Sequence, residues 1–251
     1  MKKDHIFFPR RFFQNGQGLV EYGLLLALIA IGIVLVMSLT GVSVSDLYCR
    51  AATAIGGEAC QGLATYCEDT FDGDTSGWQS LNGKTLNQGG QMCFSNYMQN
   101  LNRCSMEMPE KDYVIDMNGV TLKQGNGFGI YFRSTVDKNG LDGYAFQYDP
   151  GAMGNGNKNG SFLIRRWING VEVMTPIAIA PMSGTDTYNV PHDFKVVVKG
   201  DVYTVFMDGN QILKAKDSTY PTGGTGLRSW DSTSGCFNDF SISQTPKQET
   251  P

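Results

Sequence analysis

Residues 192–212 read HDFKVVVKGDVYTVFMDGNQI, and this stretch decides the fold class. Apolar and polar side chains alternate on both sides of Asp208-Gly209, which is the pattern of two half-buried strands. An Asp-Gly pair favours the positive backbone angles of a two-residue hairpin turn. The stretch and the residues after it therefore predict three consecutive strands, the last two joined as a hairpin: His192–Lys199, Val202–Met207 and Asn210–Lys216.

The same pattern continues toward both ends of the chain. Asn169-Gly170 predicts a second hairpin turn, between strands over Phe162–Ile168 and Val171–Ala180. Further alternating segments predict strands over Tyr66–Phe71, Gln91–Ser95, Tyr113–Leu122, Gly127–Ser134, Gly143–Tyr148, Gly224–Ser229 and Phe237–Ser243. Because these short strands are separated by glycine-containing turns, residues 67–244 are expected to form an antiparallel sandwich.

The composition excludes several other classes. The 251 residues include 31 glycines, but these lack the three-residue period of collagen. Charged residues make up only 18% of the chain, and the net charge is -4. No basic block occurs after the first eleven residues, so a nucleic-acid partner is not expected.

Several segments of the strand-rich part resemble the concanavalin A-like jelly rolls. Besides the hairpin stretch, they are DTFDGD from Asp69 with SGW after it, GFGIYFRS from Gly127, GGTGLRSW from Gly223 and CFNDFSIS from Cys236. The laminin-G and sugar-hydrolase relatives share this order of segments. The resemblance covers residues 67–243 and implies a sandwich whose concave face often binds glycans.

The first sixty residues have a different character. Residues 1–16 form a basic leader, and residues 23–45 carry no charge. As a helix, this uncharged run would be about 35 Å long, enough to cross a bilayer core of about 30 Å. Glu21 stands at its start, where a carboxylate needs a partner. A cut after Gly16 would supply one, the α-amino group of Gln17 in a neighbouring copy.

The segment from Gly16 to Tyr22 resembles the processing site of type IV prepilins, and its Glu21-Tyr22 pair resembles the Flp (Tad, type IVb) kind. The resemblance covers residues 10–57. It implies cleavage between Gly16 and Gln17 by a prepilin peptidase, Glu21 as the fifth mature residue, and a helix that polymerises into a filament core. A plain signal anchor with a chance glutamate is the alternative. The expected domains are a leader (1–16), a polymerisation helix (17–57), a linker (58–66), the sandwich (67–244) and a flexible tail (245–251).

Together, these parts predict an α+β chain, with a long N-terminal hydrophobic helix followed by an all-β antiparallel jelly-roll sandwich. The expected function is that of a structural subunit of an extracellular type IV pilus, with the sandwich exposed for adhesion or glycan binding. Expected partners are further copies in a helical filament, the prepilin peptidase, the pilus assembly machinery and surface glycans. The expected location is the inner membrane before assembly and the pilus afterwards. The alternatives are a membrane-anchored extracellular enzyme acting on polysaccharide and an anchored sugar-binding protein that never polymerises.

Six cysteines in a chain with a membrane segment fit an oxidising compartment. Many pairings are open, and spacing favours Cys93–Cys104 around a short Asn-rich segment and Cys49–Cys60 at the helix exit. The remaining pair, Cys67–Cys236, would join the first strand to the last. Reduced cysteines scattered in the core are the alternative.

Aromatic and arginine side chains are the candidates for sugar binding. Trp167, Trp230 and Tyr148 offer rings that stack on a sugar, with Arg133 and Arg228 as hydrogen-bond donors. A position in the core is the alternative for each tryptophan.

The acidic residues predict binding without cleavage. They lie in turns rather than two positions apart on one strand face, as a two-carboxylate glycosidase requires, so no catalytic residue is expected. Asp72, Asp74 and Ser76 place oxygen atoms at alternate positions and form a candidate calcium loop, with an ordinary Asp-Gly turn as the alternative. No other cofactor is expected.

Overall fold

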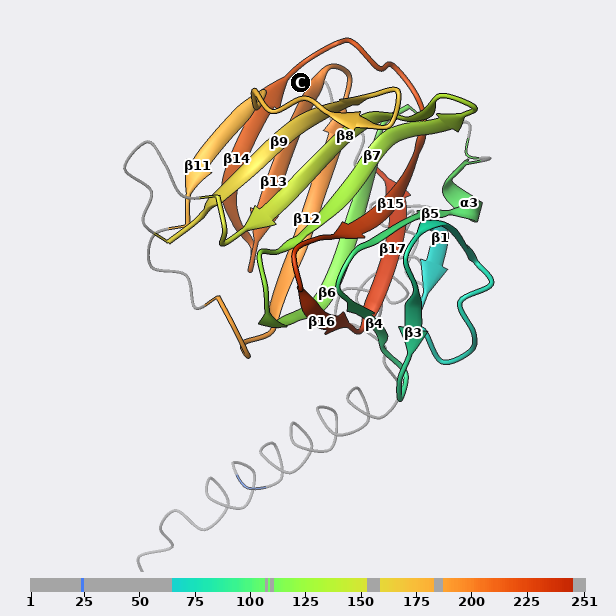
Figure 1. Cartoon of the computed structure of the whole chain (residues 1–251), viewed down its shortest axis with the longest axis vertical. Coiled ribbons are helices and arrows are strands. Elements are labelled where there is room, and N and C mark those ends of the chain that lie inside the picture. Colours follow the sequence, from blue (N-terminus) through green and yellow to red (C-terminus); the bar gives the residue numbers. More distant parts are fainter. Residues whose placement is uncertain are drawn as a thin grey trace, which may run out of the picture. The chain divides into compact units, whose positions relative to one another are not determined.

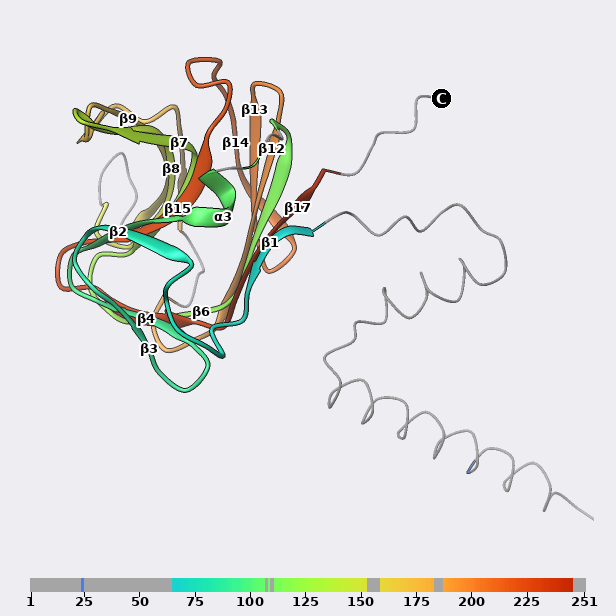
Figure 2. The same ribbon diagram turned by 90° about the vertical axis from the view of Figure 1, so that its right-hand side faces the viewer.

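The computed structural model describes Leu24 and residues 65–106, 108, 111–152, 159–182 and 187–245. The chain divides into two units between Gly62 and Leu63, and every described residue except Leu24 belongs to the second unit. In this unit, two antiparallel sheets face each other (Figure 1, Figure 2).

The larger sheet has nine strands among the described residues. One part contains β14 (Asn210–Lys216), β13 (Val202–Met207), β12 (His192–Lys199), β6 (Tyr113–Gln124), β17 (Asp239–Gln244) and β1 (Thr65–Asp69). The other contains β16 (Ser234–Phe237), β4 (Met92–Ser95) and β3 (Thr85–Asn87). The long strand β6 joins the two parts, because residues 113–118 pair with β17 and residues 121–124 pair with β16.

The smaller sheet has eight described strands. They are β10 (Val171–Glu172), β11 (Ala178–Pro181), β9 (Ser161–Ile168), β8 (Gly140–Asp149), β7 (Phe128–Asp137), β15 (Gly224–Ser229), β5 (Met98–Asn102) and β2 (Trp78–Asn82). Both β10 and β11 pair with β9. A short helix, α3 (Arg103–Met106), follows β5.

Both predicted hairpins are confirmed. Strands β13 and β14 pair with Met207 opposite Asn210, and β9 and β10 pair across Asn169-Gly170 in the same way. Asp208 and Asn169 have φ angles of 50° and 51°, in the left-handed region that Asp and Asn adopt more readily than most residues. The local turn chemistry therefore sets the pairing of these strands.

Four strands, β2, β3, β5 and β16, have no counterpart in the sequence prediction. The sequences of the first three are WQSLN, TLN and MQNLN, rich in the polar residues that seldom mark a strand. In addition, the single strand predicted over Val171–Ala180 is two short strands, β10 and β11. These strands depend on pairing with neighbours that are distant in sequence.

The predicted α+β class with a long N-terminal helix is wrong, because the described residues form an all-β sandwich with one four-residue helix. The sandwich part of the prediction fits this fold. Within the described part of the chain, no helix has the length and apolar character needed to cross a membrane. Apart from Leu24, the predicted leader and polymerisation helix, with Gly16, Gln17, Glu21 and Tyr22, lie outside the described residues.

The main core lies between the two sheets, and strand alternation decides which side chains enter it. Tyr144, Phe146 and Tyr148 of β8 are buried in the core. Successive side chains on a strand point to opposite faces. Gln147 and Asp149 of the same strand therefore lie on the outer face of the smaller sheet.

The structure contains two disulfides among the described residues, Cys67–Cys104 and Cys93–Cys236. The predicted pairs Cys93–Cys104 and Cys67–Cys236 are wrong, and the predicted pair Cys49–Cys60 lies outside the described residues. Cys93 and Cys236 are directly opposite each other on β4 and β16, while α3 brings Cys104 to β1. Strand pairing, rather than closeness in sequence, selects the partners.

Peptide mapping under non-reducing conditions is expected to recover Cys67 linked to Cys104 and Cys93 linked to Cys236. Alkylation before digestion is needed, because a free thiolate exchanges with disulfides. The reduced and alkylated protein is the control. A peptide linking Cys93 to Cys104 would contradict the strand register described above.

Candidate functional site

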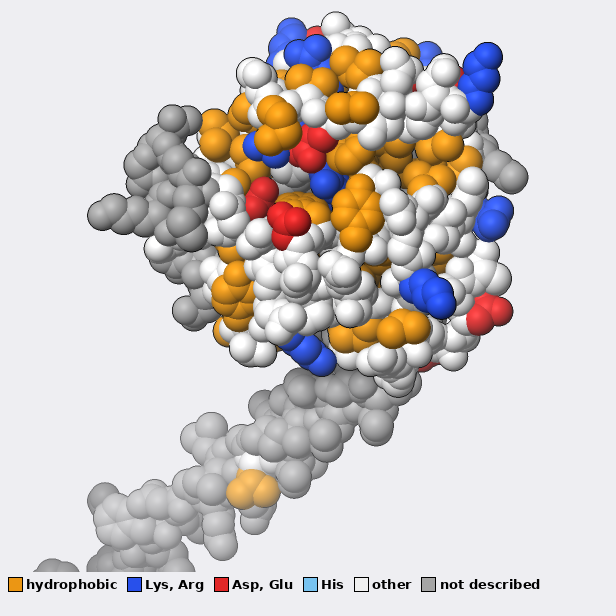
Figure 3. Space-filling view, in the orientation of Figure 1, with side chains coloured by type: hydrophobic (Ala, Val, Ile, Leu, Met, Phe, Trp, Pro, Cys, Tyr) orange, Lys and Arg blue, Asp and Glu red, His pale blue; other side chains and the backbone are white. Residues whose placement is uncertain are grey.

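A hollow of about 390 Å³ opens on the outer face of the smaller sheet. Figure 3 shows acidic, basic and apolar side chains gathered around a depression on this face. The lining comes from β8, β9, β10, β15 and the adjoining loops: Asn126, Gln147, Asp149, Gly151, Ala152, Arg165, Glu172, Met174, Arg228, Trp230 and Asp231.

Glu172 connects the charged groups of this hollow. Its Oε1 accepts a hydrogen bond from Arg165 Nη1, and its Oε2 accepts one from Arg228 Nη1, both at 2.9 Å. Gln147 Nε2 also donates to Oε1 of Glu172. Burial opposes ionisation of Glu172, but the charge of Arg228 and the hydrogen bonds from both arginines outweigh it and lower its pKa. The carboxylate thus holds two guanidinium groups in fixed positions.

The guanidinium of Arg228 is stacked between two indole rings. Its Cζ atom lies 4.6 Å from the ring centroid of Trp167 and 4.5 Å from that of Trp230. Trp167 packs edge-on against Tyr131, with ring centroids 5.6 Å apart, and Gln99 Nε2 donates to the Tyr131 hydroxyl at 2.8 Å. Cation–π stacking and the ion pair with Glu172 together orient the planar fork of Arg228.

Asp149 forms part of the wall of the hollow at the end of β8, and it is only 7% exposed. Burial raises its pKa to about 6, although the backbone N–H of Ala152 and the charge of Arg165 act in the opposite direction. The chain returns to β9 through Gly160, which has a φ of 92°. A Cβ at Gly160 would collide with Pro150 and the carbonyl of Asp149, so the close approach requires glycine.

The hollow therefore combines several kinds of polar group with an aromatic rim. Arg165 and Arg228 supply donors, Asp149 and Gln147 supply acceptors, and the half-buried Trp230 supplies a ring. Ligand sites of this kind use a few fixed polar groups for orientation and aromatic surface for contact. The combination suits a small ligand with many hydroxyl groups.

The structure brings together three of the five predicted ligand-binding residues. Arg228 and Trp230 line the hollow, and Trp167 lies beneath Arg228 with 4% of its surface exposed. Tyr148 lies between the two sheets, 1% exposed, so the prediction that it stacks on a ligand is wrong. Arg133 also lies elsewhere.

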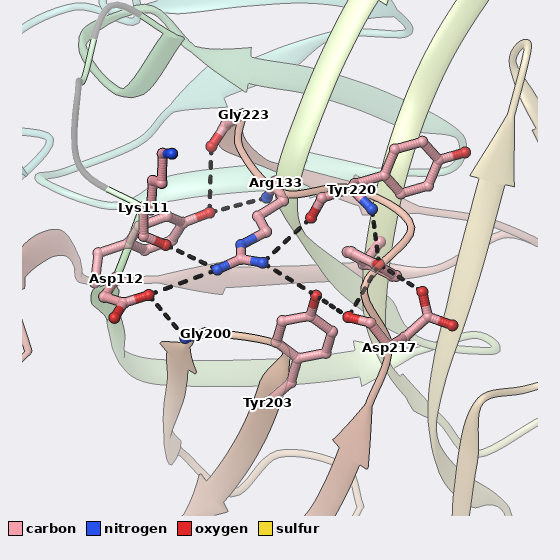
Figure 4. A network of polar contacts seen from close by, with 10 residues as sticks. Lys111, Asp112, Arg133, Gly200, Tyr203, Asp217, Tyr220 and Gly223 are labelled. Carbon is pink, nitrogen blue, oxygen red and sulfur yellow. Dashed lines mark hydrogen bonds and ion pairs between the residues drawn. The ribbon is translucent and has the colours of Figure 1, made fainter.

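Arg133 belongs to a buried polar network at one end of the sandwich (Figure 4). Its Nη1 donates to the Tyr203 hydroxyl at 3.3 Å and to the Tyr220 carbonyl at 3.2 Å. Its Nη2 donates to the Lys111 carbonyl at 3.0 Å and lies 3.6 Å from Asp112 Oδ1. The pairing of β7 with β8 is irregular at this point, and Arg133 has a φ of 48°. The prediction that Arg133 binds ligand is wrong, because its guanidinium links strands and loops inside the domain.

Asp72, Asp74 and Ser76 lie in the turn after β1. Asp74 Oδ1 accepts a hydrogen bond from the Ser76 N–H at 2.9 Å, and Asp72 Oδ2 accepts one from Thr70 Oγ1 at 2.9 Å. The hydrogen bonds from Ser76 lower the pKa of Asp74. Such local bonds are typical of Asx turns. In the described ranges, no three His, Cys, Asp or Glu side chains gather in a way that suits a metal, and calcium binding at this turn stays a prediction.

Only Arg228 and Trp230 among the lining residues are predicted from the sequence, and the polar residues Gln147, Asp149, Arg165 and Glu172 are among those that are not. The sequence does contain a pattern that could have identified some of them. Polar residues two positions apart in an otherwise apolar strand, such as Gln147 and Asp149, lie on the same face of the strand. Glu172 follows the second hairpin turn and lies opposite Trp167. Only the pairing of the strands shows that these residues share one face.

Comparison with known proteins finds similarity to one curated sequence and to solved structures of the same fold. No family profile matches the chain. The chain is 29% identical over 122 residues to a levanase of Bacillus subtilis (strain 168), and this match covers 45% of the chain but only 15% of the levanase.

Two solved structures show the same fold. The carbohydrate-binding module CBM66 from Bacillus subtilis superposes with a TM-score of 0.54 at 20% identity, over 67% of this chain and 96% of the module. The exoplasmic/lumenal domain of VIP36, with Ca²⁺ and Man3GlcNAc bound, has a TM-score of 0.58 at 16% identity, over 75% of this chain and 92% of that domain.

These comparisons correct the pilin assignment. The described fold resembles a carbohydrate-binding module and a domain that holds a bound oligosaccharide, and the expected function as a pilus subunit is wrong. The expected location, the inner membrane followed by a pilus, depended on that assignment and is wrong with it. The comparisons give no support to filament copies, a prepilin peptidase or a pilus assembly machinery as partners.

Proposed function

We propose that the sandwich is a carbohydrate-binding domain and that its ligand site is the hollow around Glu172. One observation carries this proposal: one partly buried carboxylate, that of Glu172, fixes two arginines at the hollow, and one of these arginines is stacked between two tryptophans. The likeness to CBM66, to VIP36 with its bound oligosaccharide and to the levanase supports it.

The two arginines are prepared to donate to hydroxyl groups. Glu172 engages Nη1 of both Arg165 and Arg228. Among the described residues, none accepts a hydrogen bond from Nη2 of either arginine. Ligand hydroxyls accept from these groups, and the fixed positions of the arginines reduce the entropy lost on binding. Trp230, half-buried at the rim, provides an aromatic surface for the ring of the sugar.

The same geometry favours binding over cleavage. A retaining glycosidase needs one carboxylate free to attack and a second one to donate a proton. In this hollow, both oxygens of Glu172 are held by guanidinium groups. The match to the levanase covers a small part of that enzyme and gives no reason to assign its activity to this chain.

The full chain is expected to be retained on immobilised levan or on immobilised Man3GlcNAc without shortening either. Affinity electrophoresis in levan and a glycan array measure retention, and a reducing-sugar assay measures cleavage. Unmodified gel and an unrelated acidic protein are the controls. Absence of retention on both glycans would contradict the proposed function, and release of reducing ends would show that the domain is an enzyme.

A further inference from the structure

We infer that Asp149 is a ligand-binding residue of this hollow: its ionised carboxylate accepts a hydrogen bond from a ligand hydroxyl and thereby makes binding dependent on pH. This inference rests on the proposed function. It goes further, since it assigns one residue as the acceptor and names the condition under which the site is complete.

The position of Asp149 is fixed by the strand and by the turn after it. Asp149 and Gln147 lie two positions apart on β8, on the face that carries the hollow. The Ala152 N–H donates to the Asp149 carbonyl at 3.2 Å, and Ser161 Oγ donates to the Ala152 carbonyl at 2.9 Å. The backbone of Asp149 is therefore held at the wall of the hollow by an ordered turn.

The charges around Asp149 leave it incompletely compensated. Arg165 on β9 attracts it and Glu172 on β10 repels it, while Arg228 and Asp231 complete the charged lining of the hollow from β15 and the turn beyond. Tyr188, which precedes β12, interacts with it as well. Glu172 forms ion pairs with both arginines, so their positive charges mainly compensate Glu172 rather than Asp149. Burial then dominates and raises the pKa of Asp149 to about 6.

Glu172 does not respond in the same pH range. Its two ion pairs lower its pKa, so it stays ionised while Asp149 takes up a proton. Protonation converts Asp149 from an acceptor into a donor and removes the negative charge that complements ligand hydroxyls. The ligand prefers the ionised form, so affinity falls as the pH falls through the pKa of the free protein.

The expected profile follows from one proton linked to binding. Between pH 7 and pH 5, the affinity of the full chain should fall about tenfold, because one proton must be released for each ligand bound below the pKa. Isothermal titration calorimetry measures this, with levan or Man3GlcNAc as the probe, whichever retains the chain. Asp149→Asn should bind weakly at every pH and lose this dependence. Asp201 is the control, because its carboxylate is exposed and pairs with Lys216 on the other sheet. The Asp201→Asn variant should keep the wild-type pH profile.

Two measurements without ligand complete the test. Carboxyl NMR of the free protein should show a titration midpoint near 6 that Asp149→Asn lacks. Asp149→Asn should also unfold at a higher temperature than wild type at pH 7.5. A raised pKa means that ionisation of Asp149 costs the folded state stability as the pH rises, and this advantage should vanish near pH 4.

The outcomes separate the two proposals. Retention of glycan with a flat pH profile, or the same profile in Asp149→Asn, would overturn the inference and leave the proposed function intact. A carboxyl midpoint near the ordinary value for aspartate would overturn it too. Absence of retention on levan and Man3GlcNAc at every pH would overturn both.

Discussion

Arg228→Ala is expected to lower glycan affinity by at least about 100-fold, equivalent to about 3 kcal/mol. The substitution removes the donor stacked between Trp167 and Trp230 and leaves Glu172 with one of its two guanidinium partners. Both the ligand contact and the alignment of the site are lost. Calorimetry with the glycan that retains the wild type measures the change.

Two control variants separate binding from folding in this experiment. Lys216→Ala removes an exposed cation, 73% accessible, whose ion pair with Asp201 lies on the other sheet, and binding should not change. Arg228→Lys keeps the charge but lacks the planar fork, so it should bind weakly as well. Wild-type affinity in a folded Arg228→Ala protein would place the ligand site elsewhere.

Arg133→Met is expected to lower the free energy of unfolding by about 3–5 kcal/mol, the range seen when one partner of a buried ionic network is removed. Arg133 is 3% exposed, and its guanidinium makes three hydrogen bonds within the network. Methionine fills similar space but leaves the Tyr203 hydroxyl and two carbonyl groups with fewer partners. Urea unfolding followed by tryptophan fluorescence measures the loss.

Glycan affinity is the second readout for Arg133. Because Arg133 lies outside the hollow, folded Arg133→Met protein should bind as the wild type does. Lys216→Ala again serves as the surface control for stability, with a change below about 1 kcal/mol. If Arg133→Met kept the wild-type stability but lost glycan binding, Arg133 would be a ligand-binding residue, as the sequence predicts.

The residue types in the sequence identify candidates for a ligand site, but backbone geometry decides where each candidate lies. Trp167, Arg228 and Trp230 are predicted from their chemistry to bind a sugar, and the structure stacks Arg228 on both indole rings beside the hollow; ligand binding by them stays a prediction. Arg133 was chosen on the same grounds, but an irregularity in β7 directs it into the network of Figure 4. The prediction that Tyr148 contacts a ligand is wrong because Tyr148 points into the core. Its neighbours Gln147 and Asp149 occupy the outer face of the smaller sheet.

The disulfide pairs also could not be predicted from local sequence. Pairing Cys93 with Cys104 relied on a short separation in sequence. In the sandwich, β16 pairs with β4, and so Cys93 meets a partner 143 residues away. The expected pilus function is wrong for another reason, since it extends a local pattern in the first sixty residues to the function of the whole chain.

The sequence by itself determined most of the described strands and the two hairpin turns at Asp208-Gly209 and Asn169-Gly170, because alternation and turn chemistry act over a few neighbouring residues. Only the tertiary structure decided the site. Arg165, Glu172 and Arg228 lie on three different strands, and the order β10-β9-β8-β7-β15 places them on one face. Strand order depends on the total burial of two sheets against each other, a non-local quantity that no short pattern records.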